Sequence, residues 1–176
     1  AAYGAVTEVV NYVQFPALSI AITASILAAQ AIGAGANERL GRILKTGLWL
    51  NVAITGGLVL LGYALSRVFL GLFLTQENVL AQAEHFLHIM LWSILIFGFQ
   101  AVIGGLMRAS GVVLVPTLIT IFCIIVVQTG VAWALDARMG LPGIWLGFPV
   151  AYLVMLGLQT AYYHGVWRHK EIRRLV

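Results

Sequence analysis

The chain has 176 residues, of which 61% are hydrophobic and 9% are charged, and its mean hydropathy is +0.99. Soluble domains carry roughly 25% charged residues, so this composition excludes an ordinary soluble globule. The 10 Lys and Arg residues lie at the ends of apolar stretches and not on one compact face, which argues against a nucleic-acid partner. One membrane span takes about 20 apolar residues, so the length allows about five to seven spans.

The first predicted span covers residues 5–32 and carries polar side chains in its first half. Glu8, Asn11 and Gln14 fall on one helical face, because a helix turns about 100° per residue. A polar face at this depth is unfavourable against lipid and is tolerated against protein or a wet cavity. Two interpretations stay open, an interhelical hydrogen-bonding face and the wall of a cavity. Pro16 lacks an N–H and is expected to bend this helix.

A helix stop, a tight turn and a new helix start follow the first span. Gly33 and Gly35 permit the positive φ values that a tight turn requires. The second span is predicted over residues 46–66. Its small and polar residues fall on one side, which is typical of a close-packing face. These residues are Gly47, Asn51, Thr55 and Gly62.

The third span, predicted over residues 84–107, lies at the centre of the chain. Gln100 and Gly104 share one face, which we expect to meet protein or a cavity. The opposite face carries no polar atom and is expected to face lipid. Arg108 ends the span where a cation complements the helix dipole, and Gly111 can supply a left-handed stop. The apolar face consists of Leu91, Leu95, Val102 and Leu106.

Two further spans are predicted over residues 113–135 and 144–163. Gln128 is the deepest strong hydrogen-bonding residue of the fourth span. The fifth span carries an aromatic stripe, which usually packs against protein, although an apolar pocket for cations would use the same residue types. A basic tail, residues 164–176, is predicted to lie in the cytoplasm. The stripe consists of Trp145, Phe148, Tyr152, Gln159 and Tyr163.

The distribution of basic residues predicts the orientation in the membrane. With five spans, the first loop, the third loop and the C-terminus share a side, and only Arg67 and Arg138 lie on the other side. The positive-inside rule therefore places the C-terminus in the cytoplasm and the N-terminus outside. An outside N-terminus without a signal-peptide pattern is expected if at least one span precedes the chain, so we expect a fragment of a longer protein. The cytoplasmic basic residues are Arg39, Arg42, Lys45, Arg108, Arg168, Lys170, Arg173 and Arg174.

The sequence contains no pattern typical of an enzyme. It has no Ser/His/Asp set, no closely paired carboxylates and no phosphate-binding loop. His85 and His88 lie three residues apart, but no third ligand is near them, so we interpret them as polar interface residues and predict no metal site. Proline-bent helices with intramembrane amides are instead typical of a transporter that changes shape around a mid-membrane site.

Three segments carry a resemblance to a known family. Residues 29–35, AQAIGAG, followed by Glu38 and Arg39, resemble a helix end of the multidrug and toxic compound extrusion (MATE) transporters. Residues 107–111, MRASG, resemble the third cytoplasmic-facing turn of that family, and residues 140–145, GLPGIW, resemble the start of its final helix. The resemblance extends over spans eight to twelve of a twelve-span transporter. It implies that residues 1–176 form most of a six-helix C-terminal lobe, an all-α membrane bundle, and that the N-terminal lobe lies elsewhere.

The resemblance also implies a function. Members of this family export organic, often cationic drugs in exchange for Na⁺ or H⁺ by alternating access, with no cofactor other than the coupling ion. The expected setting is the cell (inner) membrane, and the expected full-length protein is a monomer. The sodium-coupled branch carries an acidic residue where this chain has Phe97, which leaves Glu8 as the candidate for ion coupling. The candidates for lining the cavity are Asn11, Gln14, Gln100, Gln128, Tyr152 and Gln159.

Two other classes of function stay open. A flippase for lipid-linked precursors, from the same superfamily, would require a larger and more basic central cavity. A structural or assembly subunit of a membrane complex would be complete at 176 residues and would form a homomer.

Overall fold

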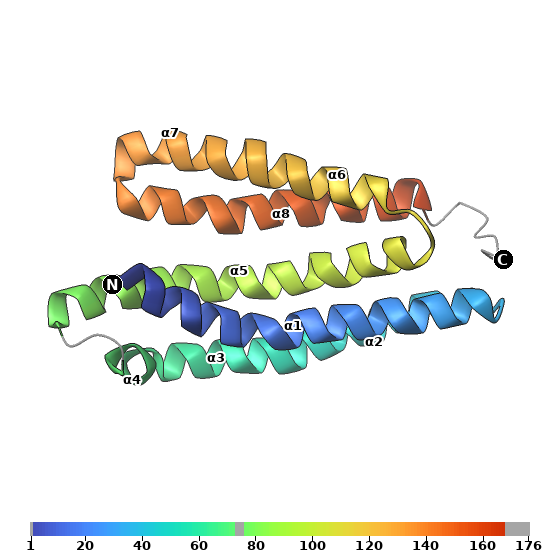
Figure 1. Cartoon of the computed structure of the whole chain (residues 1–176), viewed down its shortest axis with the longest axis horizontal. Helices are drawn as coiled ribbons and strands as arrows, with labels where there is room; N and C mark the ends of the chain where they lie inside the picture. Colours follow the sequence, from blue (N-terminus) through green and yellow to red (C-terminus); the bar gives the residue numbers. More distant parts are fainter. Residues whose placement is uncertain (1, 73–75, 168–176) are drawn as a thin grey trace.

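The computed structural model describes residues 2–72 and 76–167, and the regular structure in this part is helical throughout. Five segments are long and apolar enough to span a membrane, which confirms the predicted fold class of an all-α membrane bundle. The start of α1 and the end of α8 lie at opposite ends of the bundle, as an odd number of crossings requires (Figure 1). The five segments are Val6–Gly33, Asn37–Ala64, Glu77–Ala109, Leu114–Asp136 and Gly143–Gly165.

The helices follow one another as antiparallel rods. The first is α1 (Ala2–Gly33), and the second joins α2 (Arg39–Leu50), the π-helical turn η1 (Asn51–Thr55) and α3 (Gly56–Ala64). The short helix α4 (Ser66–Gly71) then leads towards α5 (Glu77–Ala109). The fourth rod joins α6 (Leu114–Phe122), the π-helical turn η2 (Cys123–Gln128) and α7 (Thr129–Met139), and the fifth is α8 (Leu141–Gly165).

Two of the observed spans begin earlier than the sequence predicts. The second starts at Asn37 instead of residue 46, and the third starts at Glu77 instead of residue 84, where the helical spacing of residues 79–87 predicts a short interfacial helix that runs into the span. The predictions started where the apolar residues start. The helical backbone extends further, because Glu, Arg, Gln and Lys are strong helix formers and continue a helix into the polar interface. α1 likewise continues through Pro16 as one helix.

The third span, α5, is the centre of the bundle. It packs against α1, α8, α2, α3 and α4, whereas the α6–α7 rod packs mainly on α8 (Figure 1). Two glycines of α5 permit this close approach. A Cβ on Gly98 would collide with the Asn51 side chain, and a Cβ on Gly105 would lie 3.1 Å from the backbone oxygen of Ala21. The neighbouring helices therefore contact the α5 backbone almost directly.

The prediction that one face of α5 would contact lipid is wrong. Leu91, Val102 and Leu106 are fully buried. A Cβ on Gly62 would lie 3.1 Å from the Leu91 side chain, and a Cβ on Gly47 would lie 3.0 Å from the Val102 side chain. The predicted close-packing face of the second span is thus confirmed, and it is this face that covers the apolar side of α5.

The predicted basic tail begins with a structured contact. The Trp167 indole Nε1 donates a hydrogen bond to Ser110 Oγ at 2.7 Å, and its ring stacks on Tyr163 with centroids 4.9 Å apart. Trp167 is buried, so this residue joins the end of α8 to the end of α5. The rest of the predicted tail, residues 168–176, lies outside the described residues.

Candidate functional site

A cavity of about 150 Å³ lies between the first half of α1, the middle of α5 and the first half of α8. It brings together Asn11, Gln14 and Tyr152, three of the residues that the sequence proposes as cavity-lining. The polar stripe of α1 and the aromatic stripe of α8 therefore face each other. The complete lining consists of Val6, Thr7, Val10, Asn11, Gln14, Met90, Trp145, Phe148 and Tyr152.

Helical spacing positions both walls of this cavity. Residues 7, 11 and 14 of α1 and residues 145, 148 and 152 of α8 follow intervals of three and four, which keep side chains on one face. Two phenylalanines of α5 extend the aromatic wall. Phe86 stacks on Trp145 with ring centroids 4.9 Å apart, and Phe97 lies 5.5 Å from Tyr152.

The cavity offers aromatic rings, a thioether, two hydroxyls and two amides, and no described residue that lines it carries a charge. Glu8 is exposed and does not line the cavity. A cation here would be held by ring faces and amide oxygens and not by an ion pair. Sites for drug-sized ligands are usually about 300–1,000 Å³, so this cavity fits part of such a ligand.

Gln159 lies outside the cavity, at the contact between α8 and α5. A Cβ on Gly104 would lie 3.1 Å from Gln159 Oε1 and 3.5 Å from Arg108 Nη1. The Gln159 side chain is fully buried, and within the described part of the chain neither of its amide atoms has a hydrogen-bond partner. The glycine that precedes Arg108 by one turn thus accommodates this amide.

The two remaining amide candidates also lie away from the cavity. Gln100 is buried on α5, one turn before Gly104, with 8% of its surface exposed. Gln128 is half-buried at the end of η2. A Cβ on Gly147 would lie 2.9 Å from the Gln128 backbone oxygen, so this part of η2 packs closely on α8.

Two turn glycines adopt the left-handed backbone that the sequence indicates, whereas Gly33 stays helical. Gly35 has φ 71° and Gly111 has φ 82°, both in the left-handed region. In the turn after α1 the backbone N–H of residue 36 donates to the backbone oxygen of residue 31, and in the turn after α5 the backbone N–H of residue 112 donates to the backbone oxygen of residue 107. Both turns are therefore Schellman motifs. Gly33 ends α1, and Arg108 lies exposed in the last turn of α5.

Sequence reasoning placed Asn51 and Thr55 on a close-packing face but missed that they lie in the π-helical turn η1 and leave polar atoms there unpaired within the described residues. Asn51 Nδ2 donates to the backbone oxygen of Leu95 at 3.2 Å. Asn51 and Thr55 are both fully buried, and within residues 2–72 and 76–167 Asn51 Oδ1 and Thr55 Oγ1 have no hydrogen-bond partner. π-Helical turns within α-helices are frequently found at functional sites. The available sequence signal was Asn51, an amide within an apolar span, four residues before Thr55.

A second polar cluster, at the end of the bundle where α4 lies, was also missed. Arg67 Nε pairs with Glu84 Oε2 at 3.0 Å, and Ser66 Oγ donates to Glu84 Oε1 at 2.8 Å. The hydrogen bond and the charge of Glu84 raise the pKa of the Arg67 guanidinium. Tyr63 stacks on His88 with centroids 4.2 Å apart, and its hydroxyl donates to the His88 backbone oxygen at 2.7 Å. These pairs join residues that are 17 to 25 positions apart, which helical spacing alone does not predict.

Comparison with known proteins identifies the family. The chain is 46% identical over 178 aligned residues to the "Probable multidrug resistance protein YoeA" of Bacillus subtilis (strain 168), covering 100% of this chain and 38% of that protein. It is 27% identical over 136 residues to the "Multidrug and toxin extrusion protein 1" of Danio rerio, covering 76% of this chain and 23% of that protein. No solved structure matches the chain significantly. The MatE family model matches residues 1–134, about three-quarters of the sequence, and this multi-pass membrane chain belongs to the MatE family.

Proposed function

We propose that the chain is most of the C-terminal lobe of a transporter that exports organic, often cationic compounds in exchange for Na⁺ or H⁺. The chain spans 38% of the length of its Bacillus subtilis relative, as a lobe that lacks one of its six helices would. Both relatives are named for multidrug resistance or toxin extrusion. Residues 1–176 would then supply spans eight to twelve, and the rest of the protein would supply the opposite wall.

The cavity of Asn11, Gln14 and the aromatic residues of α8 is the observation that carries this proposal. It combines a polar wall with rings, which suits an amphipathic aromatic cation. Its volume of about 150 Å³ is too small for a whole drug, so we propose that it is one half of a site completed by the N-terminal lobe. Rocking of the two lobes would expose the site to each side of the membrane in turn.

Ion coupling in this proposal relies on residues outside the cavity. Phe97, at the position where the sodium-coupled branch carries an acid, contacts the Tyr152 ring and offers no ion ligand. Glu8 is exposed on α1, next to the lining residue Thr7, and is the acidic candidate within the chain, while the other coupling acids would lie in the N-terminal lobe. In this proposal the transporter lies in the inner membrane with its C-terminus in the cytoplasm, and the full-length protein is a monomer.

Export of ethidium by the full-length protein in everted membrane vesicles tests the proposal. We expect Asn11→Leu and Gln14→Leu together to reduce export about tenfold at equal membrane abundance, because both amides of the α1 wall are lost. Gln82→Leu is the matched control, since Gln82 is an exposed amide of α5 that lines none of the described cavities. Export that stays unchanged in the double variant would contradict the assignment of the cavity.

A further inference from the structure

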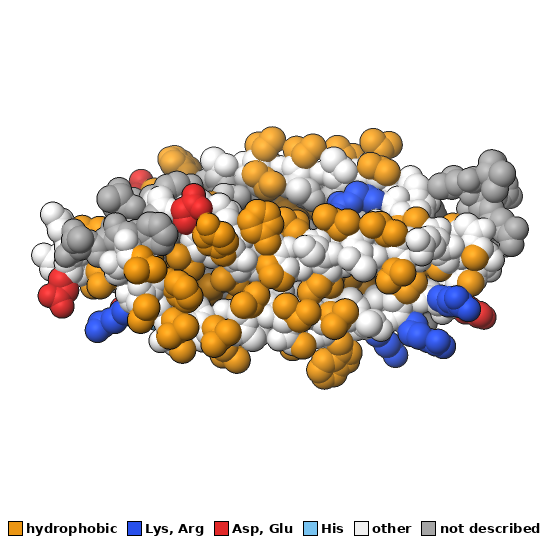
Figure 2. Space-filling model, turned by 60° about the horizontal axis from the view of Figure 1, so that its bottom comes forward, with side chains coloured by type: hydrophobic (Ala, Val, Ile, Leu, Met, Phe, Trp, Pro, Cys, Tyr) orange, Lys and Arg blue, Asp and Glu red, His pale blue; other side chains and the backbone are white. Residues whose placement is uncertain are grey.

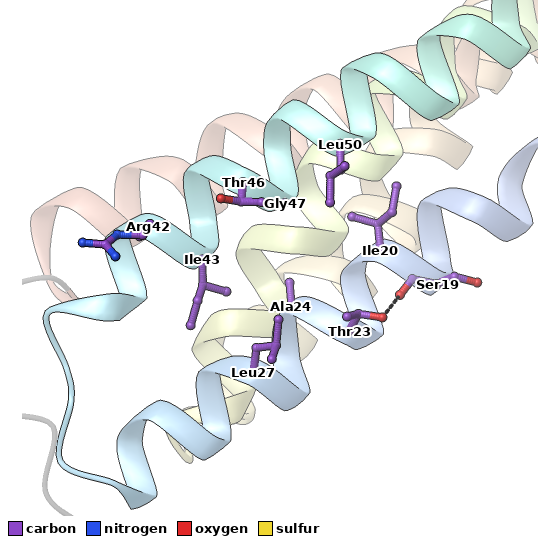
Figure 3. Close-up of a pocket in the computed structure, with 10 residues that line it drawn as sticks. All are labelled: Ser19, Ile20, Thr23, Ala24, Leu27, Arg42, Ile43, Thr46, Gly47 and Leu50. Carbon is purple, nitrogen blue, oxygen red and sulfur yellow. Dashed lines mark hydrogen bonds between the residues drawn. The ribbon is translucent and has the colours of Figure 1, made fainter.

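The outward face of α1 and α2 carries a groove that shares no lining residue with the proposed export cavity. The groove has a volume of about 350 Å³ and runs between the two helices (Figure 3). Ile43 and Leu50 from α2 extend towards Leu27 and Ile20 from α1 (Figure 3). We propose that this groove binds an acyl chain of an anionic phospholipid, whose phosphate pairs with Arg39 and Arg42.

The wall of the groove is apolar although its sequence contains hydroxyl groups. Ser19 Oγ donates to the backbone oxygen of Phe15 at 3.0 Å, and Thr23 Oγ1 donates to the backbone oxygen of Ser19 at 2.8 Å. Both hydroxyls are therefore satisfied within α1 (Figure 3). Apart from Thr46 and Arg42, the groove consequently presents carbon atoms, which an acyl chain can contact without covering an unpaired polar atom.

A second cavity continues the groove to the end of the helices. It has a volume of about 460 Å³ and shares Leu27, Arg42 and Ile43 with the first. It extends the path to Gln30 and Arg39, beside the first loop. From residue 19 to residue 31, α1 advances about 18 Å at about 1.5 Å per residue. One leaflet is about 15 Å of hydrocarbon, or about 20–22 Å with its headgroups, so the path matches one lipid in length.

The charge at this end of the groove is complementary to a phosphate. Arg39 and Arg42 are exposed, and within residues 2–72 and 76–167 the one ion pair joins Arg67 to Glu84, elsewhere in the bundle. Lys and Arg side chains gather at this end of the molecule next to apolar surface (Figure 2). Two unneutralised guanidiniums at headgroup depth attract anionic lipids and can bind phosphate oxygens in a bidentate manner.

A second groove that α1 forms, with the segment α3–α4, provides an internal comparison for the groove between α1 and α2. A groove of about 340 Å³ lies between α1 and the segment α3–α4, with a lining similar in size and apolar character. No charged residue lines it among the described residues. Lipid tails can fill both grooves, but only the groove at the start of α2 carries cations at its mouth. We therefore assign a headgroup preference to this groove alone.

Lipid retention by the purified full-length protein tests the proposal. The protein is titrated with dioleoylphosphatidylglycerol or dioleoylphosphatidylcholine, and the bound lipids are counted by native mass spectrometry. We expect the wild type to retain the anionic lipid preferentially. The double variant Arg39→Ala with Arg42→Ala should weaken this binding by on the order of tenfold or more. Lys45→Ala is the matched control, because Lys45 is an exposed cation of α2 that lines neither cavity, and it should change binding by less than about twofold.

A variant that fills the groove tests the acyl-chain part separately and leaves the cations unchanged. Thr23→Trp places an indole in the groove, whereas Ile22→Trp places one on the neighbouring exposed position of α1, which lines no described cavity. We expect the first variant, and not the second, to displace the anionic lipid.

Three results would overturn the proposal. Equal retention of both lipids by the wild type would show that no headgroup site exists. An equal loss in Lys45→Ala and in the double variant would indicate a diffuse surface charge. A photo-reactive residue at Thr46 that crosslinks only to protein would show that another helix of the full-length transporter covers the groove.

Discussion

Intramembrane amides occupy two different environments in this bundle. Asn11 and Gln14 face aromatic rings across open space. Asn51 and Gln159 are fully buried against glycines of α5. The sequence signal, an amide within an apolar stretch, is the same in both environments. What differs is the residue on the opposite helix.

Aromatic side chains keep two helices apart, whereas glycine lets a helix approach until the amide packs against the backbone. A polar residue in a span therefore indicates a cavity only where the facing helix carries bulky side chains. Where the facing helix carries glycine, the same residue indicates a close helix contact. This comparison can be tested by adding a methyl group to the glycines and by removing amides on each side.

The largest effect is expected for Gly98→Ala. The added Cβ would collide with the buried Asn51 side chain, which would have to move and lose its hydrogen bond to the backbone of Leu95. We expect a loss of about 2–3 kcal/mol in the free energy of unfolding, seen as a lower melting temperature and lower membrane abundance of the full-length protein. Gly57→Ala is the control, since a Cβ there has no neighbour within 4 Å, and it should be neutral. If both variants melt alike, the close contact does not limit stability.

A smaller loss is expected for Gly104→Ala. Its Cβ would lie 3.1 Å from Gln159 Oε1 and 3.5 Å from Arg108 Nη1, and both atoms end flexible side chains that can shift. We expect destabilisation of about 1 kcal/mol in thermal unfolding followed by size-exclusion chromatography. A loss as large as that of Gly98→Ala would mean that the Gln159 amide is held as rigidly as Asn51.

The number and order of spans were predictable, because apolar stretches of sufficient length are a direct requirement of the bilayer. The glycines of the two turns were also predictable, since left-handed backbone favours glycine. The lipid-facing prediction for Leu91, Val102 and Leu106 failed for a physical reason. Lipid tails and the interior of a membrane protein are equally apolar, so periodicity cannot tell which of them an apolar face contacts.

The cavity was predictable in its parts and not as a whole. The α1 stripe and the α8 stripe follow from helical spacing, but Gln14 and Tyr152 are more than 130 positions apart, so that pairing depends on how α5 arranges its neighbours. The same limit explains why Gln100, Gln128 and Gln159 joined the candidate set. Each is an amide in a span, and the facing residues were not known from the sequence.

The Gln159 amide offers a test in the opposite direction. Gln159→Leu replaces two buried amide atoms, unpaired within the described part of the chain, by apolar groups of similar volume. We expect the melting temperature to stay the same or to rise, by an amount equivalent to at most about 1 kcal/mol. A clear fall would show that the full-length protein provides a partner for this amide, which would then be a functional contact between lobes.

The smallest effect on stability is expected for Asn11→Leu alone. Asn11 is exposed and borders the cavity, so its replacement creates no collision and leaves no buried partner unpaired. The free energy of unfolding should change by less than about 0.5 kcal/mol. The same variant should still reduce ethidium export, because the amide is lost from the proposed substrate wall. A substitution that affects transport and not melting, beside Gly98→Ala, which lowers the melting temperature, would separate the two environments experimentally. If Asn11→Leu instead lowers the melting temperature as Gly98→Ala does, the α1 stripe is a packing face and the cavity closes in the full-length protein.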